Sequence, residues 1–215
     1  RHACMCVCAC MCGAAAVLLL PPFYYKNAMQ EGIYAFVSTV IEQVGARAPR
    51  IMLYHIPQMG AGIGWSIDLI GRLRTAFPEI IAGIKDSAGD ADHTIALIDA
   101  FPDFAVFPGA EVYLLEALRR GASGCISATA NVNTRGIVKL LEGKDGPEAE
   151  ALQEQLKAVR NAIQSRGLIP AIKAVLAARY GDDTWRNVRP PLQPASAEVQ
   201  AELAAEPALA PIISS

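Results

Sequence analysis

The sequence carries no excess of charge of either sign. Among its 215 residues, 19 are Lys or Arg and 21 are Asp or Glu, for a formal net charge of -2. A chain without a basic surplus has little with which to neutralise backbone phosphates, which excludes nucleic acid as the expected partner. Charged residues make up only 19% and hydrophobic residues 53%, so the chain can bury a sizeable core and is not disordered over most of its length.

Cysteine is almost missing beyond the first 12 residues, where Cys125 stands alone. The other cysteines alternate near the start, at Cys4, Cys6, Cys8, Cys10 and Cys12. Cysteines two apart in a strand lie too far apart to form a disulfide easily. Alternating thiols can chelate zinc or copper(I), but no second cluster completes such a site, and His55 and His93 offer no ligand set of their own. We therefore predict neither a metal nor another cofactor.

Apolar runs of membrane-spanning length are absent except near the start, where residues 3–20 carry no polar side chain other than thiols. This run is at the lower limit for a transmembrane helix, and Arg1 before it gives a crude outline of a secretion signal. Alternating cysteines are typical of neither, and the run ends at Pro21 and Pro22. We interpret residues 1–12 as an atypical Cys-rich segment, an artefact or fragment end, and expect a cytoplasmic protein with no membrane partner.

Beyond residue 13, short apolar runs alternate with amphipathic stretches of helical period. Continuous apolar runs are typical of strands that are covered on both faces. The runs that predict strands are Ala16–Leu20, Ile51–Tyr54, Ile80–Ile84, Phe104–Phe107 and Gly124–Ser127. The stretches that predict helices are Glu31–Val44, Ser66–Phe77, Asp92–Phe101, Ala110–Arg120, Gly146–Ser165, Ile169–Arg179 and Ser196–Ala205. The last residues predict a helical or frayed tail.

The alternation of strand and helix predicts an α/β fold with a parallel sheet and right-handed crossovers. A complete (β/α)8 TIM barrel takes about 250 residues, so about the last five βα units of such a barrel, followed by C-terminal helices, fit this chain. On that interpretation residues 13–145 form a partial TIM barrel, and residues 146–215 form a helical region and tail. The alternative is a free-standing doubly wound sheet, without a dinucleotide site because no G-x-G-x-x-G follows the first strand.

Polar side chains follow the apolar runs at the strand ends where parallel α/β folds gather their functional groups. Lys85 comes directly after I-I-A-G-I, which places its amine in or just above an apolar interior. Desolvation there lowers the pKa of a lysine and frees the amine to attack a carbonyl. The other interpretation is a lysine that reaches solvent or pairs with Asp86. Tyr54 ends the neighbouring run, either as a core tyrosine or as the phenol that shuttles protons during Schiff-base formation.

With these residues in place, the chain resembles the dihydrodipicolinate synthase / N-acetylneuraminate lyase family of pyruvate-dependent class I aldolases. The matching segments are G-A-A-A-V-L-L-L-P-P-F-Y-Y-K, Q-E-G-I-Y, Y-H-I-P, G-I-K-D-S-A-G-D, F-P-G-A-E and G-A-S-G-C-I-S-A-T-A-N-V. They run from Gly13 to about Leu192, and their order and spacing are specific. The resemblance implies a Schiff-base-forming lyase, an aldolase or dehydratase, that acts on pyruvate, a related 2-oxo acid or a sugar acid.

The resemblance also implies roles for individual residues. Lys85 would form the Schiff base, Tyr54 would shuttle protons and contact the substrate carboxylate, and Tyr25 would be the second tyrosine of the relay. The residues implied to contact substrate, through side chains or backbone, are Ser87, Gly109, Glu111 and Ile126. Full-length relatives imply a homo-oligomer, either a dimer or a tetramer.

Two departures from the family pattern narrow this interpretation. Met59, in Q-M-G-A-G, stands where dihydrodipicolinate synthases carry an arginine, which speaks against 4-hydroxy-tetrahydrodipicolinate synthase itself. The family's first three βα units, with a G-T-T-G-E or G-S-x-G-E carboxylate-binding loop, have no counterpart. We therefore expect little or no aldolase activity from this chain alone. An inactive remnant that serves binding or assembly is the alternative hypothesis.

Overall fold

The computed structural model describes residues 13–60 and 62–214, so the predictions made for residues 1–12 lie outside the described residues. The chain divides into two compact units. Within the described part, the first unit comprises residues 13–109 and 120–123, and the second comprises residues 110–119 and 124–214. No helix in this part of the chain is long and apolar enough to span a membrane. The domain boundary expected after residue 145 stays a prediction.

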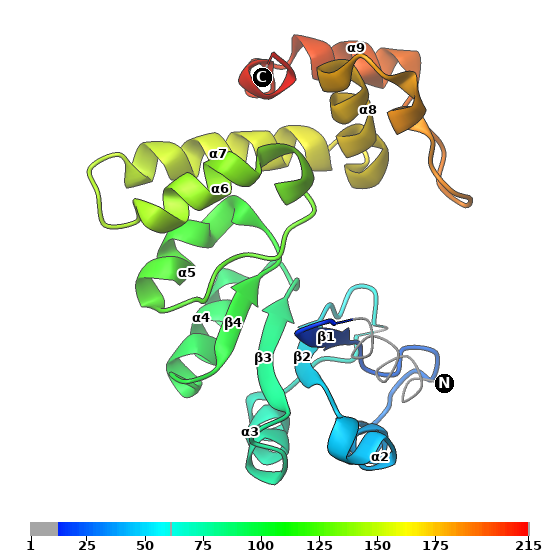
Figure 1. Cartoon of the computed structure of the whole chain (residues 1–215), viewed down its shortest axis with the longest axis vertical. Coiled ribbons are helices and arrows are strands. Elements are labelled where there is room, and N and C mark those ends of the chain that lie inside the picture. Colours follow the sequence, from blue (N-terminus) through cyan, green and yellow to red (C-terminus); the bar gives the residue numbers. More distant parts are fainter. Residues whose placement is uncertain (1–12, 61, 215) are drawn as a thin grey trace. The chain divides into compact units, whose positions relative to one another are not determined.

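The first unit contains a parallel sheet of four strands in the order β1-β2-β3-β4 (Figure 1). The strands are β1 (Ala16–Leu19), β2 (Arg50–His55), β3 (Ile81–Asp86) and β4 (Ala105–Pro108). Each strand pairs in parallel with the next strand along the chain. The predicted α/β class and the first four predicted strands are therefore confirmed.

The fifth predicted strand, Gly124–Ser127, is wrong. The Ser123 N–H donates to the carbonyl of Val106 in β4 at 2.9 Å, but residues 122–127 form no strand. Gly121 and Gly124 have φ angles of 117° and 148°, which turn the backbone out of the extended conformation. The apolar run Gly124–Ser127 therefore leaves the sheet, and it belongs to the second unit.

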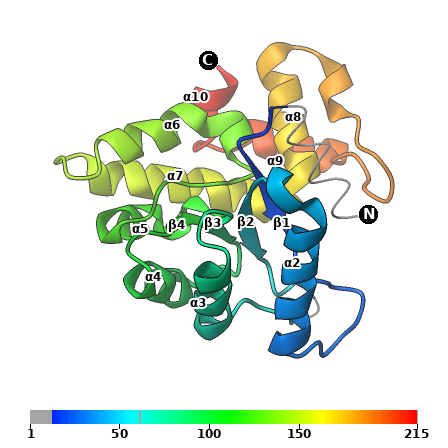
Figure 2. The ribbon, with the colours of Figure 1, turned by 60° about the horizontal axis from the view of Figure 1, so that its bottom comes forward.

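A helix follows each of the first three strands: α2 (Gln30–Val44), α3 (Ile67–Ala76) and α4 (Ala91–Ala100). Figure 2 shows these helices side by side along one face of the strands. Two of them begin at a side chain that accepts a backbone hydrogen bond: Ser66 Oγ from Leu69 at 3.1 Å, and Asp90 Oδ1 from His93 at 3.2 Å. A 3-10 turn at Gly45–Arg47 links α2 to β2. The predicted helices in this unit are confirmed to within two residues at each end.

The two faces of the sheet differ because side chains alternate along a strand. One register line is fully buried and consists of Leu53, Ile84 and Val106, each 0% exposed. The next line points to the opposite face, is half-buried and consists of Tyr54, Lys85 and Phe107. The buried face holds the sheet against the helices, and the other face carries the lysine and tyrosine singled out in the sequence.

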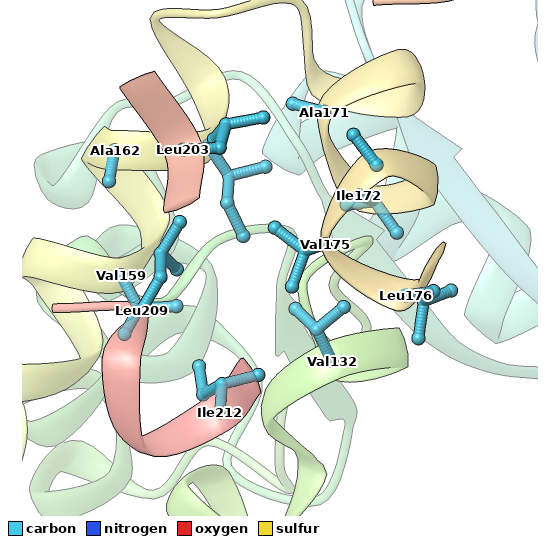
Figure 3. Close-up of a cluster of buried hydrophobic side chains, with 12 residues drawn as sticks. Val132, Val159, Ala162, Ala171, Ile172, Val175, Leu176, Leu203, Leu209 and Ile212 are labelled. Carbon is cyan, nitrogen blue, oxygen red and sulfur yellow. The ribbon is translucent and has the colours of Figure 1, made fainter. Parts of the chain in front are cut away.

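The second unit is helical. It contains 3-10 helices at Glu111–Tyr113 and Asp183–Arg186, and it contains α5 (Leu114–Arg120), α6 (Ala130–Glu142), α7 (Ala149–Gln164), α8 (Leu168–Tyr180), α9 (Ala197–Ala205) and α10 (Ala210–Ile213). Only the last residue of α5, Arg120, is assigned to the first unit. Figure 3 shows the apolar core of the second unit, in which Val159, Val175, Leu203 and Ile212 come from four different helices. Leu209 is 0% exposed in this core, so the end of the described chain is packed rather than frayed.

Two glycines of the first unit offer a matched test of this architecture. A Cβ at Gly83 would meet the backbone carbonyl of Ala105 and lie 2.8 Å from Met52 Sδ, whereas a Cβ at Gly32 in α2 would meet nothing within 4 Å. We expect Gly83→Ala to lower the free energy of unfolding by about 1–3 kcal/mol, because a neighbouring backbone cannot move aside. Gly32→Ala should raise it by about 0.5–1 kcal/mol, because alanine favours the helix. Urea denaturation followed by circular dichroism measures both, and equal signs would contradict this account.

Candidate active site at the carboxyl ends of the strands

Lys85 and Tyr54 are register partners in neighbouring strands, and each is the last residue but one of its strand. The Lys85 Nζ lies 4.3 Å from the centroid of the Tyr54 ring. An ammonium group over an aromatic face is attracted by the electrons of the ring. The structure therefore brings together the lysine and the tyrosine that the sequence analysis selected, at the strand ends where parallel α/β folds place functional groups.

The contact between these two side chains involves the ring face of Tyr54. The backbone of Tyr54 is fixed by Trp65, whose indole N–H donates to the Tyr54 carbonyl at 3.0 Å. Trp65 is only 1% exposed. The tyrosine is thus held by a buried anchor while its ring stays half-buried beside the amine.

Ser87 and Gly109 lie against each other just beyond the ends of β3 and β4. The Ser87 N–H donates to the carbonyl of His55 at 2.7 Å, and the Gly109 N–H donates to the carbonyl of Asp86 at 2.6 Å. A Cβ at Gly109 would overlap the Ser87 hydroxyl and lie 2.9 Å from its Cα, so only glycine permits this approach. These bonds tie together the ends of β2, β3 and β4. The contacts of Ser87 and Gly109 with substrate stay predictions.

Tyr25 lies in the connection between β1 and α2, and its side chain is 75% exposed. Its ring packs edge-on against that of Tyr24, with centroids 5.3 Å apart. In the part of the chain that the structure describes, no hydrogen bond or ring contact joins Tyr25 to Lys85 or Tyr54. Its role in a proton relay stays a prediction.

Glu111 and Ile126 belong to the second unit. Glu111 is 1% exposed, and its carboxylate accepts hydrogen bonds from the hydroxyls of Ser127, at 2.9 Å, and Thr129. Arg160 completes the group, with Nη1 3.8 Å from a Glu111 oxygen. The carboxylate is thus engaged in holding the interior of this unit together. Ile126, the residue before Ser127, is half-buried. The contacts of Glu111 and Ile126 with substrate stay predictions.

A buried polar cluster that was not predicted from the sequence lies on the helix-facing side of the same strand ends. Asp86 is 0% exposed and His55 is 7% exposed. One Asp86 oxygen accepts from the Thr94 hydroxyl at 2.7 Å and lies 2.9 Å from His93 Nδ1, while the other accepts from the Ala88 N–H at 3.0 Å. The His55 and His93 rings stack with centroids 4.4 Å apart. The sequence does carry a signal for this cluster. β2 ends on His55 and β3 ends on Asp86, at positions where the alternation of each strand predicts an apolar side chain.

His55, Asp86 and His93 bring ligand atoms within 4.8 Å of one another, so the prediction that the two histidines have no nearby ligand partner is wrong. Their orientation nevertheless does not fit a metal ion. The lone pairs of an imidazole lie in the ring plane, and the planes of His55 and His93 are stacked and only 17° from parallel, so these lone pairs do not converge. Nδ1 of His55 already accepts a hydrogen bond from the Trp65 N–H at 3.2 Å.

The charges in this cluster are set by the hydrogen bonds and by burial. The hydrogen bond to Asp86 raises the pKa of His93 above its ordinary 6.5, and the charges of Asp86 and Asp90 add to that effect against burial. Burial lowers the pKa of His55, in spite of the Asp86 charge. Burial also works to raise the pKa of Asp86, but its hydrogen bonds outweigh burial and the pKa is lowered overall. These shifts favour the charged forms of His93 and Asp86 and the neutral form of His55.

Replacing His93 with asparagine tests this charge assignment. His93→Asn keeps an N–H donor near Asp86 but removes the charge, so it should lower the free energy of unfolding by about 1 kcal/mol. A folded pKa above 6.5 means that the contribution of the charge is fully present below pH 6.5 and is lost as the pH rises through the folded value. Urea denaturation of both proteins across this range measures the difference. A difference that grows with rising pH would contradict the assignment.

Comparison with known proteins shows the family to which the chain belongs. The model of the dihydrodipicolinate synthetase family matches residues 6–207. A relative from Chloroflexus aurantiacus, described as an uncharacterized DapA-like lyase, is 34% identical over 200 residues, which cover 90% of this chain and 64% of the relative.

Solved structures of this family superpose well on the chain. Dihydrodipicolinate synthase from Agrobacterium tumefaciens matches with a TM-score of 0.86 and 32% identity, covering 98% of this chain and 70% of that one. The chloride-inhibited synthase from Acinetobacter baumannii, solved with pyruvate, matches with a TM-score of 0.84 and 29% identity over the same shares of the two chains. The chain spans less than two thirds of the length of the first curated relatives that it matches. On this evidence the chain belongs to the dihydrodipicolinate synthetase family.

Proposed function

We propose that the protein is a Schiff-base-forming lyase, an aldolase or dehydratase, that acts on pyruvate or a related 2-oxo acid or sugar acid through Lys85. The observation that carries this proposal is the placement of the Lys85 amine over the ring of Tyr54, 4.3 Å from its centroid, at the carboxyl ends of two paired strands. Membership of the family supports it, as does the pyruvate in the structure of the Acinetobacter baumannii relative. We also infer that the four-stranded sheet is a segment of a (β/α)8 barrel.

The chemistry begins with attack by the neutral Lys85 amine on the keto carbon of the substrate. The C–N bond forms as the carbonyl π bond breaks and its electrons move to the oxygen. Transfer of a proton from the nitrogen to this oxygen then gives a hydroxyl. Loss of this hydroxyl as water then gives the protonated imine. Each of these steps moves a proton, and Tyr54 is the titratable group in contact with the amine on the same face of the sheet.

The imine then serves as an electron sink for the neighbouring carbon. Loss of a proton from that carbon gives an enamine, which can add to an aldehyde and form a carbon–carbon bond, and the reverse sequence cleaves such a bond. In a sugar acid the same enamine can instead expel a hydroxyl as water. Both outcomes proceed through one imine at Lys85, so the proposal covers both.

Met59 favours a member of the family other than 4-hydroxy-tetrahydrodipicolinate synthase itself. Its side chain is 73% exposed in the loop after β2, where it offers no positive charge to a second carboxylate. The neighbouring Gln58 side chain donates to the carbonyl of Ser87 at 2.6 Å, which ties this loop to the end of β3. A loop held at this position with a neutral side chain suits an uncharged aldehyde or a single sugar-acid substrate better than a second substrate that carries its own carboxylate.

Reductive trapping tests the role of Lys85. Imine formation is only the first step and does not require the complete aldolase reaction. Incubation of the 215-residue chain with pyruvate and borohydride should therefore add the mass of one reduced pyruvate imine, which peptide mass spectrometry should locate at Lys85. Lys85→Arg should abolish the adduct, because a guanidinium does not form the imine. Lys139→Arg, at an exposed position of α6, is the matched control and should leave it unchanged. A folded chain that gains no adduct at Lys85 would favour a non-catalytic remnant instead.

The role of Tyr54 is tested by removing its hydroxyl. Tyr54→Phe keeps the ring beneath the amine but removes the proton carrier, so we expect the rate of adduct formation to fall by about 10²-fold or more. Tyr34→Phe, in α2 under the Arg72 guanidinium, serves as the control and should trap pyruvate at the original rate. Equal rates for the two variants would remove Tyr54 from the mechanism.

A further inference from the structure

The buried cluster of His55, Asp86, His93 and Thr94 lies directly behind the proposed reacting pair. His55 follows Tyr54 in β2, Asp86 follows Lys85 in β3, and the two pairs are in register with each other. Because side chains alternate, Tyr54 and Lys85 point to one face while His55 and Asp86 point to the other, toward α4. The cluster and the reacting pair thus share the same two peptide units.

Asp86 is held through both its side chain and its backbone. Its two carboxylate oxygens take three donors, and its backbone carbonyl accepts from Gly109 at 2.6 Å. On the other side of Lys85, Ile84 is 0% exposed. The lysine backbone is therefore clamped at both neighbours, which fixes the direction in which its side chain leaves the strand.

His93 is the member of the cluster that joins the two strands. Its ring bonds to Asp86 of β3 and stacks on His55 of β2, and its backbone N–H is fixed by Asp90 at 3.2 Å. The His55 ring is oriented in turn by the Trp65 N–H at 3.2 Å. A single side chain from α4 thus contacts both β2 and β3 one residue beyond Tyr54 and Lys85.

We propose that His93, acting through Asp86 and against His55, is a positioning residue that holds Lys85 over the ring of Tyr54 for Schiff-base formation. This inference rests on the proposed function of Lys85. Misplacement of a reacting group by as little as about 1 Å can cost about 10²-fold in rate, so a group that never touches substrate can still control the reaction.

The charge of His93 gives the positioning a pH dependence. The groups that face its ring are Asp86 from β3, His55 from β2 and Asp90 at the start of α4. Protonated His93 forms an ion pair with the buried Asp86, whereas the neutral ring keeps only a hydrogen bond. His55 does not take up the charge, because its Nδ1 already accepts from Trp65 and its pKa is lowered by burial. The clamp is therefore strongest below the folded pKa of His93.

The test compares reductive trapping of pyruvate in the 215-residue chain with that in two variants, with cyanoborohydride across the range from about pH 5 to pH 9. His93→Ala should trap about 10- to 100-fold more slowly below pH 6.5, because both the hydrogen bond and the charge are lost. His93→Asn should recover part of this rate, and its ratio to the unsubstituted protein should approach one as the pH rises through the folded pKa of His93. Dividing by the rate of the unsubstituted protein cancels the pH effects that all three proteins share.

Asp92→Asn is the matched control, since Asp92 is the exposed neighbour of His93 in α4, and it should trap at the original rate at every pH. Circular dichroism checks that each variant is folded, and His93→Asn keeps the test valid if His93→Ala unfolds. Equal rates for both His93 variants and the unsubstituted protein would overturn the inference but not the role of Lys85, as would a ratio that is constant with pH. Absence of any Lys85 adduct in the unsubstituted protein would overturn the proposed function, and this inference with it.

Discussion

The parallel register of β2 against β3 is the constraint on which the candidate site depends. It sets Tyr54 beside Lys85 and, one residue on, His55 beside Asp86. Alternation along the strands then sends the first pair to the half-buried face and the second to the face beneath the helices. A slip of one residue in β3 would exchange its two faces, which would bury Lys85 and expose Asp86, and a slip in β2 would do the same to Tyr54 and His55. The fully buried Leu53 and Ile84 oppose such a slip, because both would lose their apolar surroundings.

The buried charge of Asp86 has a cost that only its partners offset. A carboxylate in the interior is costly unless donors surround it, and here a threonine hydroxyl, a histidine and a backbone N–H supply them. All three donors come from the β3–α4 connection and the first turn of α4, so the same bonds that satisfy the charge also fix the start of the helix. Stability and positioning are therefore not separate properties at this strand end.

The second unit also surrounds a buried carboxylate with hydrogen-bond donors, and there the bonds join helices. Glu111, also almost fully buried, is surrounded by Ser127, Thr129 and Arg160, and its backbone carbonyl accepts from the Gln153 side chain at 2.7 Å. These contacts join the 3-10 helix at Glu111–Tyr113 to α7 and to the segment before α6. The apolar core of Figure 3 packs α7 together with α8, α9 and α10. A polar network and an apolar core thus act together within one unit.

The sequence alone determined the alternation of strands and helices, the α/β class and the choice of Lys85 and Tyr54, because each depends on local pattern or on position at a strand end. The run Gly124–Ser127 was misassigned because apolarity does not reveal that Gly121 and Gly124 turn the backbone away from the sheet. The cluster of His55, Asp86 and His93 was missed because its members are separated by up to 38 residues and meet only when α4 packs on the paired strands. Only the tertiary structure decided which polar side chains contact one another. These contacts depend on strand register and on helix packing, which no local pattern encodes.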